Sequence, residues 1–122
     1  MGCDIHASIE AKLIEDRDFI MCVARDIKID RWYELFNVLA GVRGDGNALF
    51  EIRGKPNIVS DEVREEFDKW EGDAHTYSWI TFRELKKTLP VKYRKEPFYI
   101  IMEAYSQKYG FNNVRIVFFF DN

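Results

Sequence analysis

Two short segments, "CDIH" at 3–6 and "GDAH" at 72–75, hold the residues best suited to chemistry. Each segment places an aspartate two positions before a histidine, and the chain contains no other histidine. A carboxylate beside an imidazole can orient the ring as a base, and both groups can bind a metal. The two segments therefore predict a candidate site formed by Asp4, His6, Asp73 and His75.

Convergence of the two segments would leave two chemistries open. Two histidines and two carboxylates suit a divalent transition metal such as Zn²⁺, Mn²⁺ or Fe²⁺. Without a metal, His6 and His75 could act as catalytic acid and base on a phosphodiester or glycosidic bond. The spacing does not choose between these chemistries, and each histidine could instead satisfy backbone groups near a helix cap.

Three further residues have side chains suited to holding a ligand. Arg43 and Arg53 border a glycine-bearing loop, where guanidinium groups and backbone N–H groups can hold a phosphate. Trp79 follows the second Asp-x-His segment and could stack on a base or a sugar, or belong to the core. The candidate ligand-binding set is therefore Asp4, His6, Arg43, Arg53, Asp73, His75 and Trp79.

Composition favours one compact domain. The chain has 122 residues, of which 47% are hydrophobic and 16% aromatic, which is enough apolar material for a core. The net charge of −3 gives no general attraction to nucleic acid or to a membrane surface. The basic stretch at 82–95 is a weak indication of phosphate contact, because acids of the preceding helix can compensate its charge.

Cysteine spacing and hydropathy predict the compartment. Cys3 and Cys22 do not have the spacing of a disulfide framework or a zinc ribbon, and their places in strand patterns predict small buried side chains. We see no signal peptide and no apolar run of membrane-spanning length. The sequence therefore predicts a soluble protein of a reducing cytosol, with no membrane partner.

The elements that must position the candidate residues follow from periodicity. Alternation over 3–13 predicts a strand, followed by a turn at 15–18 and a second strand at 19–29. Helices are predicted between Asp30 and Gly41, over 61–70 behind Ser60, and from Phe82 to before Pro90, where "TFRE" at 81–84 forms a capping box. Apolar segments at 98–106 and 114–120 predict a closing hairpin of two strands.

This order, ββαααββ, predicts an α+β fold, with an antiparallel sheet of about four strands and three helices packed on one face. The second Asp-x-His segment then lies in the loop between the second and third helices. Phenylalanines of the last strand would occupy both faces of the sheet, so the uncovered face is expected to form an oligomer contact or a ligand surface. A homo-oligomer is therefore expected.

Four segments of the chain together resemble a family of small phage-encoded proteins without an assigned function. They are "MGCDIH" at 1–6, "YELFNVLAGVR" at 33–43, "VSDEVREEFDKWEGDAHTYSWIT" at 59–81 and "VRIVFFFDN" at 114–122. The chain departs from the family pattern in "IRGKP" at 52–56 and at Thr76. The recurring positions of that pattern correspond here to Gly2, Cys3, Asp4, His6, Arg43, Gly54, Pro56, Asp73, His75, Ser78 and Trp79.

The resemblance implies a phage accessory protein that acts in the cytosol of a bacterial host and counters host defence. One hypothesis is binding of a nucleotide-like or phosphate-bearing small molecule. A second is a small hydrolase, such as a phosphodiesterase with or without a metal, that uses His6 and His75. A third is a protein–protein inhibitor that covers a host defence factor with the aromatic sheet face.

Overall fold

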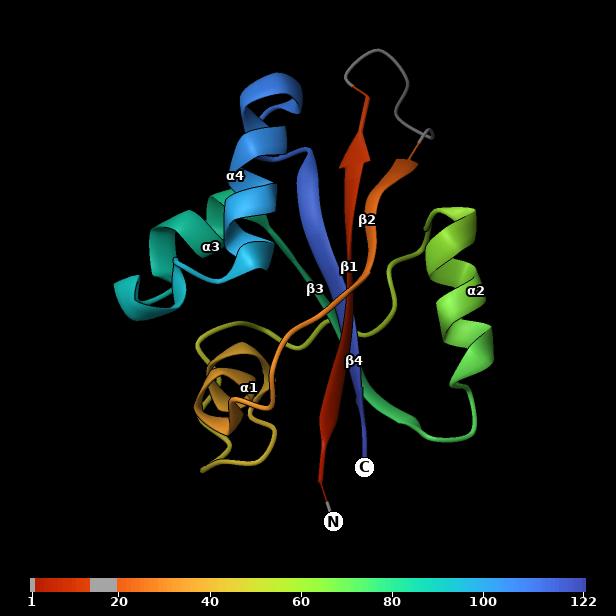
Figure 1. Ribbon diagram of the computed structural model, residues 1–122, viewed down its shortest axis with the longest axis vertical. Coiled ribbons are helices and arrows are strands. Elements are labelled where there is room, and N and C mark those ends of the chain that lie inside the picture. The colour runs from red at the N-terminus through yellow and green to blue at the C-terminus, as the bar shows by residue number, and fades with distance from the viewer. Residues whose placement is uncertain (1, 14–19) are drawn as a thin grey trace.

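The computed structural model describes residues 2–13 and 20–122 (Figure 1). The turn predicted at 15–18 lies outside these residues. In chain order the elements are β1 (Asp4–Lys12), β2 (Ile20–Ile27), α1 (Tyr33–Ala40), α2 (Asp61–Lys69), β3 (Ala74–Thr81), α3 (Phe82–Thr88), the short 3₁₀ helix η1 (Val91–Tyr93), α4 (Pro97–Tyr109) and β4 (Val114–Asp121).

The strands form one antiparallel sheet in the order β2-β1-β4-β3. The first and last strands of the described chain are therefore neighbours at the centre, paired from Asp4 with Asp121 to Ala11 with Val114. The strand predicted from alternation over 3–13 is confirmed as β1. Because β1 is central and both of its faces are covered, even polar Ser8 and Glu10 are buried.

Three helices, α1, α3 and α4, cover one face of the sheet (Figure 1). Their apolar side chains pack against the residues of β1 and β4 that point to this face, and together these form the larger core cluster. Aromatic rings dominate the cluster, because Phe36, Phe82, Phe98, Phe118 and Phe120 are all fully buried in it.

The opposite face is covered in part by α2, which stands alone on that side in Figure 1. Val63 and Phe67 of α2 pack against Val117 and Phe119 of β4 in a second, smaller cluster. The prediction that the helix at 61–70 shares a face with the other helices is therefore wrong. The phenylalanines on both faces of β4 explain why each face needs a cover.

Two segments have a different type of structure from the one predicted. Residues 98–106, predicted as a strand, belong to α4, which Pro97 begins and Gly110 follows. Residues 74–81, predicted as a loop, form β3. The observed order is ββααβααβ, so the α+β class and the antiparallel sheet are confirmed while the closing hairpin is not.

Local helix signals are confirmed where they were predicted. Ser60 caps α2 by accepting the N–H of Val63 at 3.3 Å. Thr81 and Glu84 form both hydrogen bonds of the capping box that begins α3. Gly41 ends α1 in the left-handed conformation, with φ of 71°, which explains why a glycine stops this helix.

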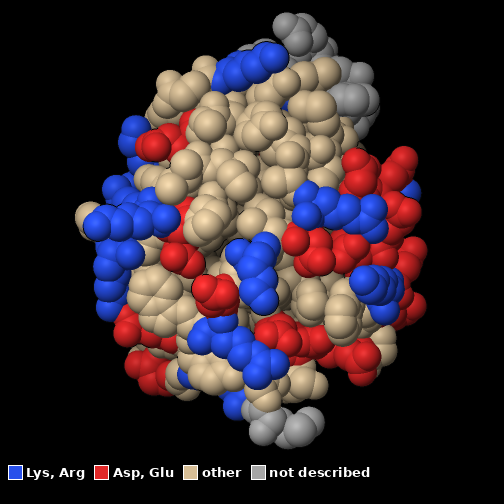
Figure 2. Space-filling view, in the orientation of Figure 1, with Lys and Arg blue, Asp and Glu red and all other residues tan. Residues whose placement is uncertain are grey.

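Charge is unevenly distributed over the surface. Figure 2 shows acidic side chains gathered over α2, which carries Asp61, Glu62, Glu65, Glu66 and Asp68. Lysine and arginine side chains gather on the opposite flank, over the region of α3 and η1. The basic stretch predicted at 82–95 and the acidic helix thus lie on different sides of the sheet.

Candidate binding site

His6 and His75 lie on opposite faces of the sheet. His6 pairs with Phe119 of β4, whereas His75 pairs with the next residue, Phe120. Successive residues of a strand point to opposite faces, so the sheet separates the two rings. Ring contacts agree, because His6 stacks on Phe119 in the α2 cluster and His75 stacks on Phe120 in the larger core. The predicted convergence of the two Asp-x-His segments is therefore wrong.

His6 is held between two aromatic rings. Its ring centroid lies 4.2 Å from that of Trp70 and 5.1 Å from that of Phe119. Its Nε2 lies 3.4 Å from Oδ2 of Asp121, and its Nδ1 lies 3.8 Å from Oδ1 of Asp26. The ring is largely buried, with 13% of the side chain exposed. These contacts indicate a structural role for His6, which packs between the end of α2 and the sheet.

His75 has a different set of neighbours. Its Nδ1 lies 2.9 Å from Oγ1 of Thr76, and its Nε2 lies 3.4 Å from Oδ1 of Asn122. Thr76 has a left-handed backbone, with φ of 57°, at the irregular position of β3. None of these partners touches His6, so each histidine has its own local role.

Neither aspartate of the two segments supports a metal site. Asp4 accepts two hydrogen bonds from Arg31, at 2.7 and 3.1 Å, and these bonds lower the pKa of the Asp4 carboxyl. Asp73 is exposed after α2. Over residues 2–13 and 20–122, no group of three or more His, Cys, Asp or Glu side chains could hold a metal ion. The predicted metal centre of Asp4, His6, Asp73 and His75 is therefore wrong.

Arg43 and Arg53 are also separated. Arg43 follows α1 in a left-handed conformation, and its guanidinium lies 5.4 Å from the ring centroid of Tyr33. Burial raises the pKa of the neighbouring Cys3 thiol, and a hydrogen bond with Arg43 opposes that rise. Arg53 lies instead on the far side of the loop, next to Trp79. Among the predicted ligand-binding residues that are distant in the sequence, the structure brings Arg53 next to Trp79.

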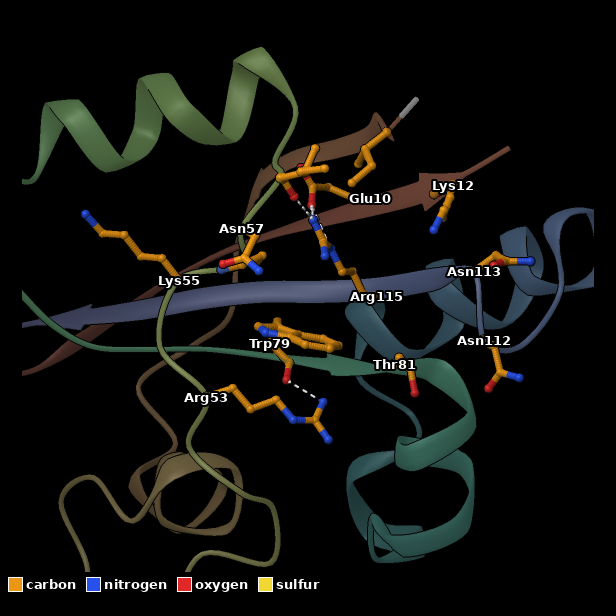
Figure 3. Close-up of a pocket in the computed structure, with 14 residues that line it drawn as sticks. Glu10, Lys12, Arg53, Lys55, Asn57, Trp79, Thr81, Asn112, Asn113 and Arg115 are labelled. Carbon is orange, nitrogen blue, oxygen red and sulfur yellow. Dashed lines mark hydrogen bonds and ion pairs between the residues drawn. The ribbon is translucent and has the colours of Figure 1, made fainter. Parts of the chain in front are cut away.

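Arg53 and Trp79 line a pocket of about 570 Å³ on the side of the sheet that carries α2 (Figure 3). The segment 53–58 forms one wall as it leads from the edge of β3 toward α2, and the turn at 112–113 forms another. The sheet supplies the floor through residues of β1, β3 and β4, namely Glu10, Ala11, Lys12, Trp79, Thr81 and Arg115.

Hydrogen bonds to β3 and α3 fix Arg53 in the wall. Its backbone N–H donates to Oγ of buried Ser78 at 3.0 Å, which ties the segment to the edge strand. Its guanidinium lies 4.4 Å from the Trp79 ring centroid and donates to the Trp79 carbonyl at 3.1 Å. It also pairs with both carboxylate oxygens of Glu84, which lowers the pKa of Glu84 to about 2.

A second ion pair lies in the floor, between β1 and β4. Arg115 donates from Nε and Nη2 to Oε1 of Glu10, at 2.9 and 2.7 Å. Its Nη2 also donates to the carbonyl of Ile58 at 2.5 Å, which joins the floor to the wall. The Arg115 guanidinium lies 5.7 Å from the Trp79 ring centroid. In Figure 3 the indole accordingly lies between the guanidinium groups of Arg53 and Arg115.

Two lysines complete the cationic lining. Lys12 ends β1, and Lys55 places its Nζ 4.6 Å from the ring centroid of Tyr77. Among the residues that the structure describes, neither ammonium group forms an ion pair. Arg53 and Arg115 are paired with carboxylates, so the lysines supply the pocket charge that no carboxylate of the described residues compensates.

Four residues of the pocket were not predicted from the sequence: Glu10, Lys12, Lys55 and Arg115. One available signal was Arg115 itself, a single charged residue in the otherwise apolar segment 114–120. A second was Glu10 on the polar face of the first strand, because a charged residue in a central strand needs a partner of opposite charge. Lys12 and Lys55 carry no local signal, since only the fold places them at the same pocket.

No protein-family model, curated protein or solved structure matches the chain. Within the part of the chain that the structure describes, no helix has the length and apolar character needed to cross a membrane.

Proposed function

We propose that this protein binds a phosphate-bearing small molecule with a planar ring, such as a nucleotide, in the pocket around Trp79 and Arg115. The lining is the observation that carries the proposal. Four cationic side chains and one carboxylate surround an indole, in a protein whose net charge is −3. Such a local excess of positive charge attracts anions to one place on an otherwise acidic protein.

The pocket offers a matching group for each part of a nucleotide. A volume of about 570 Å³ lies within the range of small-molecule sites. The indole of Trp79, flanked by guanidinium planes, gives planar surfaces for a base. The amides of Asn57 and Asn112 line the same pocket and can hydrogen-bond to base edges or sugar.

The hydrolase hypothesis has less support from these residues. Its two histidines lie on opposite faces of the sheet, so one substrate cannot contact both. The described residues that line the pocket include neither histidine nor cysteine, and the one carboxylate, Glu10, is already engaged by Arg115 and by the N–H of Ser60. Binding without turnover is the activity that this lining supports.

The inhibitor hypothesis required an uncovered aromatic sheet face, and α2 covers the part of that face formed by Val117 and Phe119. A host defence protein as partner therefore stays a prediction. So does the phage role, in which the bound molecule would be a nucleotide-type signal of host defence that this protein removes from solution.

Calorimetric titration with nucleoside 5′-monophosphates of four bases, with inorganic phosphate as reference, tests the proposal. We expect stoichiometric binding of at least one nucleotide, and recovery of the intact nucleotide after heating the complex. The variant Trp79→Leu should bind about tenfold more weakly or worse, because a base loses its stacking surface. The matched control Trp32→Phe removes an indole that packs on Tyr93, outside the pocket, and should bind normally. Absence of nucleotide binding, or equal affinity of Trp79→Leu and wild type, would overturn the proposal.

A further inference from the structure

Lys12 and Lys55, which pair with no carboxylate of residues 2–13 and 20–122, lie at opposite ends of the pocket. In Figure 3, Lys12 lies beyond Arg115 at one end and Lys55 lies at the other end, with Trp79 and Arg115 between them. Arg115 is paired with Glu10, and Arg53 with Glu84. Positive charge that is free to meet an anion is therefore concentrated at both ends rather than at one point.

The strand register gives the separation of these ends. Lys12 lies next to Asn113, whose carbonyl accepts the Lys12 N–H at 2.7 Å. Lys55 lies over Tyr77, and the Tyr77 ring packs on that of Phe119 at 5.2 Å. From Asn113 to Phe119 the chain advances about 20 Å, at roughly 3.3 Å per residue. Even with both lysine stems turned inward, one phosphate cannot meet both ammonium groups.

We infer that the pocket takes a ligand of at least two linked nucleotides, with one phosphate at Lys12 and another at Lys55. This inference rests on the proposed function and adds the class of ligand. Arg115 and Trp79, between the lysines, meet the intervening backbone and base. Stacking on an indole tolerates any base, so the lysines select for length and charge spacing rather than for sequence.

A length series distinguishes this inference from the binding of a mononucleotide. The probes are 5′-phosphorylated oligothymidylates and oligouridylates of one to four nucleotides, titrated into the wild-type protein in a calorimeter. We expect affinity to rise about tenfold at the length that first reaches both lysines, since a charge-assisted contact contributes about 1.5 kcal/mol. The salt dependence of log Kd should steepen by about 0.7 for each added phosphate contact.

The lysine variants locate the two contacts. Lys12→Gln and Lys55→Gln should each abolish the affinity step, so that the four-nucleotide probe binds either variant about tenfold more weakly than it binds wild type. Lys87→Gln, at an exposed position of α3 outside the pocket, is the charge-matched control and should keep the step. Thermal unfolding of the variants confirms that each is folded.

The outcomes separate the two proposals. Affinity that is equal for one and four nucleotides, or an affinity step that survives both lysine variants, would overturn the inference and leave nucleotide binding in place. Failure of every one of these probes, together with failure of all four nucleoside monophosphates to bind, would overturn both proposals.

Discussion

Arg115 of β4 donates its Nε proton to Oε1 of Glu10 on β1 at 2.9 Å, between positions that are directly paired in the sheet. Glu10 is almost completely buried, with 1% of its surface exposed, and its Oε2 accepts the N–H of Ser60 at 2.7 Å. One buried carboxylate thus joins the two central strands to the start of α2. The floor of the pocket and the attachment of α2 depend on the same side chain.

Replacement of this carboxylate should destabilise the protein strongly. In Glu10→Gln the Arg115 guanidinium loses its compensating charge where only 18% of its side chain is exposed. Breaking such a pair costs about 3 kcal/mol in free energy of unfolding. Asp61→Asn is the matched control, because Asp61 is 92% exposed and its contact with Arg64 is long, at 3.9 Å. Its expected cost is below about 0.5 kcal/mol. Urea denaturation measures the free energy of unfolding of both variants. An equal loss in Glu10→Gln and Asp61→Asn would contradict a structural role of Glu10.

The ion pair of Arg53 with Glu84 predicts a pH dependence of stability. The pKa of Glu84 is lowered from 4.5 to about 2, chiefly by hydrogen bonding from Arg53. A lowered folded-state pKa gives stability that is fully present above pH 4.5 and is lost as pH falls through about 2. Glu84→Gln should therefore be less stable than wild type at pH 7, by about 1 kcal/mol or less because the pair is partly exposed.

The same difference in stability should shrink between pH 4.5 and pH 2, measured by urea denaturation at each pH. Glu103→Gln, at an exposed position of α4, reports the general effect of removing one surface carboxylate and serves as the control. A difference between wild type and Glu84→Gln that stays constant down to pH 2 would show that the charge of Glu84 does not stabilise the fold.

The two histidines should be energetically independent. His6 contacts Trp70 and Phe119, whereas His75 contacts Thr76 and Phe120, so they share no partner. In a double-mutant cycle of His6→Ala and His75→Ala, the costs in unfolding free energy should add within about 0.5 kcal/mol. Urea denaturation of the four proteins gives the coupling energy. A larger coupling energy would restore the hypothesis that both rings belong to one site.

The failed convergence of His6 and His75 shows what periodicity leaves open. Alternation correctly assigns His6 to a strand, whereas His75, predicted in a loop, lies in β3. The face on which each ring lies depends on strand register. A shift of one residue between strands moves every side chain to the other face. Phe119 and Phe120 are adjacent in the sequence, and only the pairing of β4 with β1 and β3 decides which histidine lies against each.

The secondary structure was predictable where a local interaction determines it. The capping box of Thr81 and Glu84 and the cap at Ser60 involve residues three positions apart, so the sequence contains the whole interaction. The segment 98–106 was not predictable from its apolar content, because Phe98, Met102 and Ser106 are buried at helical spacing within a run that also suits a strand. In β3, the left-handed Thr76 breaks the alternation that would have identified a strand.

The candidate site was predictable only in part, and the reason is distance along the chain. Arg53 and Trp79 could be predicted as ligand-binding residues from their own side chains and local sequence, and both were in the predicted set. Glu10 and Arg115 lie at opposite ends of the sequence and meet because the first and last strands are neighbours. Lys12 and Lys55 stand out only because no carboxylate of the described residues pairs with them. Recognising this needs the three-dimensional contacts and not the sequence alone.

The attachment of the pocket wall to the edge strand gives a final prediction. Ser78 is buried in β3, accepts the N–H of Arg53 at 3.0 Å and donates to the carbonyl of Glu51 at 3.4 Å. Ser78→Ala removes both bonds and should cost about 1–2 kcal/mol in stability. Amide hydrogen exchange over 51–55 should accelerate, because the Arg53 N–H then lacks its acceptor. The affinity of Ser78→Ala for nucleotide should also fall, because Arg53 and Lys55 are no longer held in place.

The matched control is Ser106→Ala in α4. Ser106 is equally buried and donates to the carbonyl of Glu103 at 2.7 Å, but it lies outside the pocket. Its loss should reduce stability while exchange over 51–55 and nucleotide affinity stay as in wild type. Exchange over 51–55 that is the same in both variants would mean that Ser78 does not position the wall. In that case the ion pair of Arg53 with Glu84 and the bond from Arg115 to Ile58 would be sufficient to hold it.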